Sequence, residues 1–458
     1  MTAILGTQRE FSYDFPSYVN YTTKTKTNLI YLDPNNGNIR GNLNTTNTII
    51  FSYNGSDTYI NLGSNNTGIK AKIAFLTRLN NANNRDADIT FVNSFFMHMF
   101  SNAKFRLGNN EIENIANVGF LVDVMNIIKG NYNDDTILDS NTGLADSRKC
   151  NNVGTLAANF VTNNPDYNKG YYQRKLRYNY TVAGNDDVRE VEVFIPLSSI
   201  FGFCDCYDKV IKFTSIQIDL SRRSTAEKDS CIFGVDTSSM RLGDSDNTGL
   251  MNIQLVLEEI MPSPDQLMIL EERIKQPVEI NFLSRTCEMK SANQEQYYDI
   301  AETQFSNPHY VFVVARNNAA DTAQRNTSCD IHADMQEVKV SLDGKDYPNI
   351  SQMANFNNNI YSMFYQQFKE VCSKFNNNSP ISLNDYKNLY TIYCTDLTAQ
   401  PEKLTSGISN LRISMRRRAV PTADTDLRNI MNIRYYVIVL SEAKVSLDML
   451  RKVCTKLK

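Results

Sequence analysis

One stretch of this chain, residues 191–220, constrains the fold more than any other. Val191 to Ile195 alternates as a half-buried strand does, and Pro196 cannot continue a central ladder because it has no N–H to donate. Gly202 then follows within an apolar knot formed by Ile200, Phe201 and Phe203, with Tyr207 close behind. Residues 210–220 approach alternation again in their second half. The stretch therefore predicts a strand, a turn packed against a core and a second strand, without a catalytic residue.

The length of the chain predicts two domains. Its 458 residues exceed the roughly 250 to 300 at which single hydrophobic cores stop growing. Tyr (24) and Phe (23) are plentiful, Trp is absent, Gly numbers only 19 and Asn is abundant. This mixture favours aromatic-rich strands joined by long polar loops, so we expect an all-β protein.

The charge of the chain argues against a protein that grips nucleic acid. Its formal net charge is −3, whereas domains that neutralise phosphates carry a basic excess. We therefore expect no tight sequence-specific binding of nucleic acid. No window approaches the 18 or more apolar residues of a membrane span, so no transmembrane segment is expected.

Recognisable catalytic and metal-binding motifs are absent from the sequence. The chain has three His and lacks the nucleophile elbow, the Walker loop, the G-x-G-x-x-G fingerprint and H-E-x-x-H. Cys204 and Cys206 lie two apart, unlike a zinc knuckle or a redox pair, and we interpret them as packing residues. Cys329 and His332 form one C-x-x-H fragment without a second pair nearby. We expect no enzyme, no catalytic residue, no cofactor and no metal site.

Two prolines in the run 261–264 mark the boundary between the predicted domains, and Asp265–Ile274 behind them predicts a short helix. Both halves alternate short strands with long polar loops, which favours two tandem eight-stranded jelly-roll β-sandwiches with a few inserted helices. The expected parts are an N-terminal arm at 1–28, a first jelly roll at 29–261, a linker with the short helix at 262–277 and a second jelly roll at 278–458.

Hydrophobic periodicity predicts the principal elements of both halves. Strands are expected in the first half at 49–53, 59–62, 69–76, 176–182, 188–195, 210–220, 231–235 and 252–260, and a strand pair or strand-loop-strand is expected across 89–113. Strands are expected in the second half at 278–283, 310–315, 335–342 and 435–440. Helices are expected at 118–128, 360–375 and 383–392.

Five segments carry a family resemblance through their shared order: Phe91–Ile112 with Phe-Met-His-Met-Phe, Phe194–Arg222 with Ile-Pro-Leu-Ser-Ser-Ile-Phe-Gly-Phe-Cys, Met261–Arg285 with Lys-Gln-Pro-Val, Val340–Pro348, and Ser382–Gly407. In this order they resemble the double jelly-roll major capsid proteins of Polinton/Maverick elements and adintovirus-like DNA viruses. The family motif residues, as we identify them, are Pro196, Ile200, Phe201, Gly202, Phe203, Tyr207, Tyr347, Pro348 and Tyr386.

The resemblance implies a structural protein of the virion. Three chains would form a homotrimer with a pseudo-hexagonal outline, the capsomer, and capsomers would tile an icosahedral shell around double-stranded DNA. The implied partners are neighbouring capsomers and penton and minor capsid proteins, and synthesis would take place in the cytoplasm of the host cell. The alternative is a β-sandwich module that binds glycans or proteins, including a domesticated capsid relative. A large self-complementary association would distinguish the capsomer from such a module.

Overall fold

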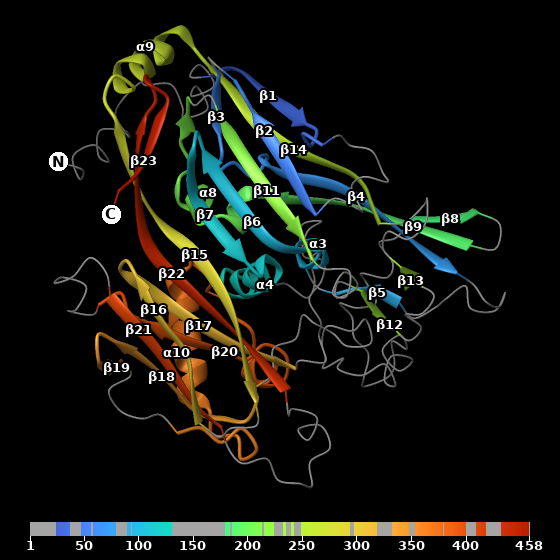
Figure 1. The fold of residues 1–458 in the computed structure, drawn as a ribbon, viewed down its shortest axis with the longest axis vertical. Helices are drawn as coiled ribbons and strands as arrows, with labels where there is room; N and C mark the ends of the chain where they lie inside the picture. The colour runs from blue at the N-terminus through green and yellow to red at the C-terminus, as the bar shows by residue number, and fades with distance from the viewer. Residues whose placement is uncertain are drawn as a thin grey trace, which may run out of the picture.

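Two β-sandwiches, one from each half of the chain, make up the computed structural model (Figure 1). The structure describes residues 24–36, 47–55, 58–78, 89–92, 94–130, 179–183, 186–212, 215–223, 232–234, 240–241, 249–293, 297–317, 332–347, 353–378, 380–399, 409–417 and 432–457. All pairings between the described strands are antiparallel.

The first sandwich consists of a four-stranded sheet and a larger sheet that face each other. The four-stranded sheet has the order β2 (Thr48–Tyr53), β11 (Ile216–Arg222), β6 (Phe100–Leu107), β7 (Asn110–Ala116). The larger sheet is built on the run β1 (Lys24–Leu32), β14 (Gly249–Pro262), β4 (Gly68–Arg78), β9 (Asp186–Pro196). It is extended by β3 (Tyr59–Asn61), β10 (Val210–Ile211), β8 (Asn179–Ala183) and β13 (Met240–Arg241). A separate pair joins β5 (Ile89–Phe91) to β12 (Ile232–Gly234).

The second sandwich has the same plan. Its four-stranded sheet has the order β16 (Tyr297–Phe305), β21 (Ser409–Arg417), β18 (Met335–Leu342), β19 (Lys345–Tyr347). The facing sheet has the order β15 (Val278–Asn293), β22 (Asn432–Asp448), β17 (Pro308–Asn317), β20 (Ile392–Asp396). The strand β23 (Val453–Leu457) pairs with β22.

The two halves share one topology. If the eight principal strands of each half are counted in chain order, both sandwiches consist of a sheet 1-8-3-6 and a sheet 2-7-4-5. Two such sheets with this connectivity form a jelly roll. In both halves, helices lie between the fifth and sixth principal strands in the chain. They are α4 (Val118–Ile128) in the first half, and α10 (Ser362–Lys374) and α11 (Leu383–Asn388) in the second. The predicted fold class, all-β with two tandem eight-stranded jelly rolls and a few helices, is confirmed.

The two jelly rolls are linked by α9 (Pro264–Arg273). The Ser263 hydroxyl accepts a hydrogen bond from the Gln266 N–H, and Pro264 occupies the first turn, where its missing donor costs nothing. No residue of α9 is buried. Residues 1–23 of the predicted N-terminal arm lie outside the described residues, and β1 begins at Lys24. The domain boundaries stay a prediction.

Some predicted elements differ from the observed ones. The helix predicted at 383–392 ends at Asn388, and β20 begins at Ile392. The first three residues of β20 are all buried, and such a continuous apolar run does not distinguish a buried strand from a helix. The short helices α3 (Phe95–His98), α7 (Leu197–Ile200) and α8 (Gly202–Cys206) were not expected, because four or five residues are too few to show a helical period. In addition, all residues of α3 are buried, so its sequence does not distinguish a helix from a buried strand. Cys204 is buried as predicted, but Cys206 is exposed.

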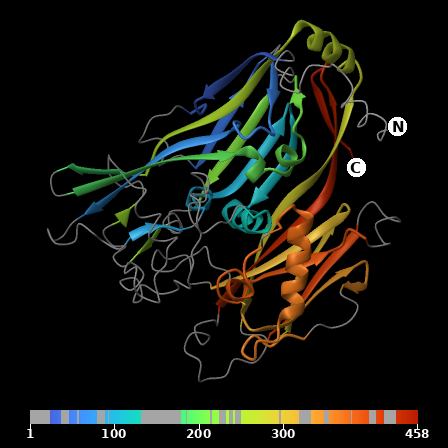
Figure 2. The same ribbon diagram turned by 180° about the vertical axis from the view of Figure 1, so that it is seen from behind.

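The first half of β15 joins the two bodies. It pairs with the last residues of β22, and both strands continue from the second jelly roll along the first (Figures 1 and 2). In this region β15 packs against β7 and α8 of the first jelly roll.

Candidate functional site: the junction between the two jelly rolls

The junction contains buried charged side chains from both jelly rolls. It includes most of the predicted motif residues, and two polar clusters organise it. We call them the Glu113 cluster, comprising Glu113, Arg285, Asp205 and Lys129, and the Asp123 cluster, comprising Asp123, His98, Arg316 and Arg223.

Glu113 faces the interior because β7 contains a bulge. Phe105 pairs with Glu113 and Arg106 pairs with Glu111, so Ile112 is an extra residue on β7. Strict alternation would place Glu111 and Glu113 on the same face, but the bulge turns Glu113 inward while Glu111 stays exposed.

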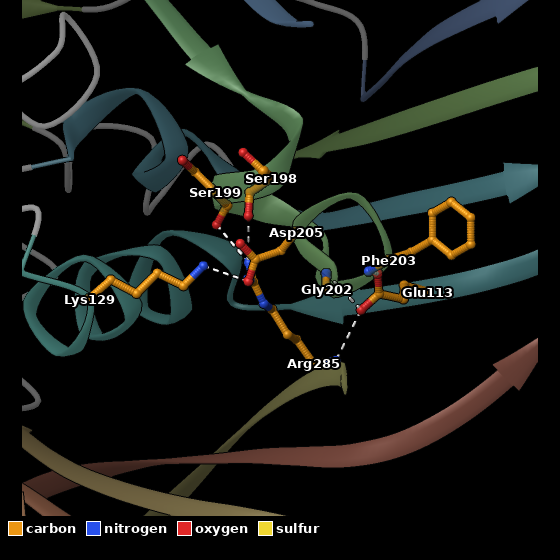
Figure 3. A network of polar contacts seen from close by, with 8 residues as sticks. All are labelled: Glu113, Lys129, Ser198, Ser199, Gly202, Phe203, Asp205 and Arg285. Atoms are coloured by element: carbon orange, nitrogen blue, oxygen red, sulfur yellow. Dashed lines mark hydrogen bonds and ion pairs between the residues drawn. The ribbon is translucent and has the colours of Figure 1, made fainter. Parts of the chain in front are cut away.

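The Glu113 carboxylate accepts hydrogen bonds from three backbone N–H groups that belong to two elements (Figure 3). The Gly202 and Phe203 N–H groups at the start of α8 donate to it at 3.2 and 2.9 Å, and the Arg285 N–H of β15 donates at 3.0 Å. Burial raises the pKa of Glu113, and these amides together with the Arg285 charge oppose that rise. One carboxylate thus connects a strand and a helix of the first jelly roll to a strand of the second.

The Arg285 side chain makes a further connection in the same place. Its guanidinium donates to the Ser198 and Ser199 carbonyls of α7 at 3.2 and 2.9 Å and to the Asp205 carboxylate at 2.6 Å (Figure 3). Lys129, just after α4, contacts the same Asp205 oxygen at 2.5 Å. Because only 2% of the Arg285 side chain is exposed, these acceptors replace the water it has lost.

Gly202 permits the close approach of β15. A Cβ atom at this position would lie 1.9 Å from the Leu283 carbonyl oxygen, well inside the separation of real atoms. Any residue with a side chain would therefore separate α8 from β15. The glycine in the predicted motif has a physical role in joining the two jelly rolls.

The aromatic motif residues fill the apolar part of the junction. Phe201 and Phe203 lie 5.4 and 5.5 Å from the Phe105 ring of β6, by ring centroids. Phe203 also meets Phe282 of β15 edge to face at 5.4 Å and lies 5.8 Å from Tyr207. Of the remaining motif residues nearby, Pro196 ends β9 and precedes α7, and Ile200 is fully buried in α7.

The other predicted motif residues do not join this group. Tyr386 is buried in α11, donates a hydrogen bond from its hydroxyl to the Ile392 carbonyl at 3.0 Å and packs on Phe368. Tyr347 ends β19 and is half-buried. Tyr386 belongs to the core of the second jelly roll, Tyr347 packs against that core, and Pro348 lies outside the described residues.

The Asp123 cluster forms a second buried connection. The His98 Nε2 of α3 lies 2.7 Å from the Asp123 Oδ2 of α4, and Arg316 of β17 approaches the same oxygen at 3.4 Å. All three side chains are at most 2% exposed. Burial lowers the pKa of His98; the Asp123 charge opposes this, and the Arg316 and Arg223 charges add to it.

The aromatic ring of Phe120 lies close to both arginines of this cluster. The guanidinium groups of Arg316 and Arg223 lie 4.5 and 5.2 Å from the Phe120 ring centroid. Phe120 also stacks on Tyr436 of β22 at 4.0 Å. Nearby, the Asn377 side chain of the second jelly roll donates to the Ile127 and Ile128 carbonyls at the end of α4, at 3.3 and 3.1 Å. The second jelly roll therefore caps a helix of the first.

Most charged residues of the two clusters, among them Glu113, Asp123, Arg285 and Arg316, were missed by sequence reasoning. A signal existed for Asp123, which interrupts the apolar run of α4, and for Arg316, which follows the apolar run of β17. No such signal existed for Glu113, because its burial depends on a bulge in the strand pairing.

The arrangement connects the two jelly rolls through buried hydrogen bonds and ion pairs. Within the described ranges, no group of three or more His, Cys, Asp or Glu side chains could hold a metal ion. None of the helices in the described part of the chain is long and apolar enough to cross a membrane.

Three solved structures with a similar fold come from viruses. A chain of the Sputnik virophage structure matches with a TM-score of 0.60 and 9% identity, covering 97% of this chain and 90% of that one. The mavirus major capsid protein matches with a TM-score of 0.54 and 11% identity, covering 97% of this chain and 94% of that one. The Faustovirus major capsid protein matches with a TM-score of 0.52 and 10% identity, covering 94% of this chain and 92% of that one. A comparison with curated protein sequences found no match.

The sequence itself matches a family model described as a double jelly roll-like domain, over residues 141–435. This range is more than half of the chain, and it extends from the first jelly roll across α9 and the junction strand β15 into β22. With two jelly rolls of one topology joined by a buried junction, the chain belongs to the double jelly roll-like family.

Proposed function

We propose that this protein is a major capsid protein whose three copies form a trimeric capsomer with a pseudo-hexagonal outline. Such capsomers would tile an icosahedral shell around double-stranded DNA. The observation that carries the proposal is the repeated topology: two jelly rolls of the same strand order in one chain, held together by buried contacts. Three chains would then present six similar bodies.

The physical basis is closed symmetry. A ring of three identical chains reuses one set of contacts, and it leaves no unsatisfied end. A pseudo-hexagonal ring needs the two jelly rolls of each chain to keep a constant relation, and domains of one chain move relative to each other unless their interface is well packed. The junction built on Glu113, Arg285 and Gly202 supplies such packing.

The fold comparisons and the sequence support the same role. Two of the similar structures are major capsid proteins by name, and each matches over more than nine tenths of both chains. The Polinton/Maverick and adintovirus-like type is supported by the ordered sequence motifs, including the run 195–204 at the junction. The small net charge of −3 is compatible with a shell that encloses DNA without gripping it.

The remaining parts of the proposal follow from this role. The protein would be structural and without enzymatic activity. It would be made in the host cytoplasm and would reside in the virion, where its partners would be neighbouring capsomers and penton and minor capsid proteins. We retain the predicted parts 1–28, 29–261, 262–277 and 278–458 as the arm, the two jelly rolls and their linker.

Light scattering coupled to size exclusion tests the proposal. A capsomer should elute with a mass near 156 kDa, three times that of the 52.1 kDa chain, at micromolar concentration. A single species at the mass of one chain would contradict the capsomer and favour the alternative, a β-sandwich that binds glycans or proteins as an isolated unit.

A further inference from the structure

A pocket of about 440 Å³ lies between the two jelly rolls, beside the Glu113 cluster. Lys129 and Asp205 line it from the first jelly roll, and Arg285 and Lys374 line it from the second. Met125 and Phe375 supply apolar surface from α4 and from the end of α10. Its size lies in the range of small-molecule sites, which combine apolar walls with a few convergent polar groups.

The wall of this pocket has more positive than negative charge. Lys129 and Arg285 contact the same Asp205 oxygen, at 2.5 and 2.6 Å, so one carboxylate serves two cations. Burial and the neighbouring Arg285 charge lower the pKa of Lys129, whereas its ion pair with Asp205 opposes this shift and favours the ammonium form. Lys374 is a third cation in the wall, and it pairs with Asp396, which is not part of the lining.

Glu113 is not part of the pocket wall. Its carboxylate accepts hydrogen bonds from the Phe203 and Arg285 backbone N–H groups. The pocket therefore offers an anion two ammonium groups in a partly enclosed place, where charge-assisted hydrogen bonds are stronger than in open water.

We propose that this pocket binds a small organic anion that bridges the two jelly rolls. Its phosphate or carboxylate group contacts Lys129 and Lys374, and its apolar body packs on Met125 and Phe375. An anion held in this way stabilises the junction, because it binds the folded pair of jelly rolls and not the unfolded chain. The pocket lies within one chain, so the proposal is independent of capsomer formation.

Isothermal titration calorimetry at constant ionic strength tests the proposal with three probes. Phenyl phosphate carries both the anionic group and an apolar body, inorganic phosphate carries only the first, and phenol carries only the second. We expect phenyl phosphate to bind at least about tenfold more tightly than inorganic phosphate, and phenol to give no saturable heat. Equal affinities for phenyl phosphate and inorganic phosphate would overturn the proposal.

Variants locate the bound probe. Lys129→Met should weaken phenyl phosphate binding by at least about tenfold. Lys374→Met should have a similar effect, and its side chain is 38% exposed, which makes loss of folding a minor concern. The matched control is Lys275→Met. Lys275 follows α9, is exposed and pairs with Glu272, and this variant should bind phenyl phosphate with the affinity of the wild type. Unchanged affinity in both pocket variants, or no binding of phenyl phosphate to the wild type, would overturn the proposal.

Discussion

The two clusters of the junction connect the jelly rolls in different ways. The Glu113 carboxylate accepts from three backbone N–H groups, so it fixes the position of two chain segments relative to each other. The Asp123 carboxylate faces charged or ionisable side chains, His98 and Arg316. Among the described residues, Asp123 Oδ1 and His98 Nδ1 have no hydrogen-bond partner. The comparison teaches that one cluster depends on geometry and the other on a balance of charge.

The largest loss of stability is expected when the negative charge of Asp123 is removed. Asp123→Asn keeps the shape of the side chain but leaves the buried Arg316 guanidinium without this carboxylate. We expect the free energy of unfolding to fall by about 3–5 kcal/mol in a denaturant titration. The control is Asp208→Asn, whose side chain is 72% exposed, with an effect of at most about 0.5 kcal/mol. Similar losses in the two variants would show that the charge of Asp123 is unimportant.

Gly202→Ala tests the geometry of the other cluster. The added Cβ would meet the Leu283 carbonyl oxygen, so β15 and α8 must separate, at a cost of about 3 kcal/mol. Gly344→Ala is the matched control: it has a φ of +85° and nothing within 4 Å of the added atom, so only backbone strain of about 1 kcal/mol is expected. The denaturation midpoints of both variants measure the difference. A smaller loss for Gly202→Ala than for Gly344→Ala would refute the close-approach argument.

Glu113→Gln should cost less than Asp123→Asn. One of the three backbone N–H groups would face the amide NH₂ in place of an oxygen, while Arg285 keeps Asp205 as its partner. We expect a loss of about 2 kcal/mol in the same titration. Glu111→Gln, two residues away and exposed, should change stability by at most about 0.5 kcal/mol. A loss for Glu113→Gln that equals or exceeds that of Asp123→Asn would reverse the comparison.

The smallest expected effect is a difference in how the two clusters make the stability of the protein depend on pH. Burial places the pKa of His98 below its usual 6.5, so its stabilising contribution is present above pH 6.5 and is lost as the pH falls toward the lowered value. Burial places the pKa of Glu113 above its usual 4.5, so its contribution is present below pH 4.5 and is lost as the pH rises through the raised value. The two clusters therefore respond to pH with opposite sign.

His98→Gln isolates the first of these responses. Between pH 7.5 and 5.5 the variant should lose about 1 kcal/mol less unfolding free energy than the wild type, as measured by urea titrations at each pH. Parallel profiles for the variant and the wild type would mean that His98 does not titrate differently in the folded chain.

Sequence patterns predict local elements of this protein better than its junction. The helical spacing of Leu121, Val124 and Ile128 predicts α4, because one face of a helix shows a clear period. The same patterns do not predict β20, since a strand buried on both faces has no period. The motif around Gly202 was identified from the sequence, but its partner Leu283 is 81 positions away in the chain, and only the folded structure brings the two together.

Cryo-electron microscopy of the purified protein tests the central claim most directly. If the junction holds the two jelly rolls in a fixed relation and three chains associate, averaged images should show one particle with threefold symmetry and six lobes around a pseudo-hexagonal ring. Images dominated by separate two-lobed particles, or by lobes in variable relative positions, would contradict the account.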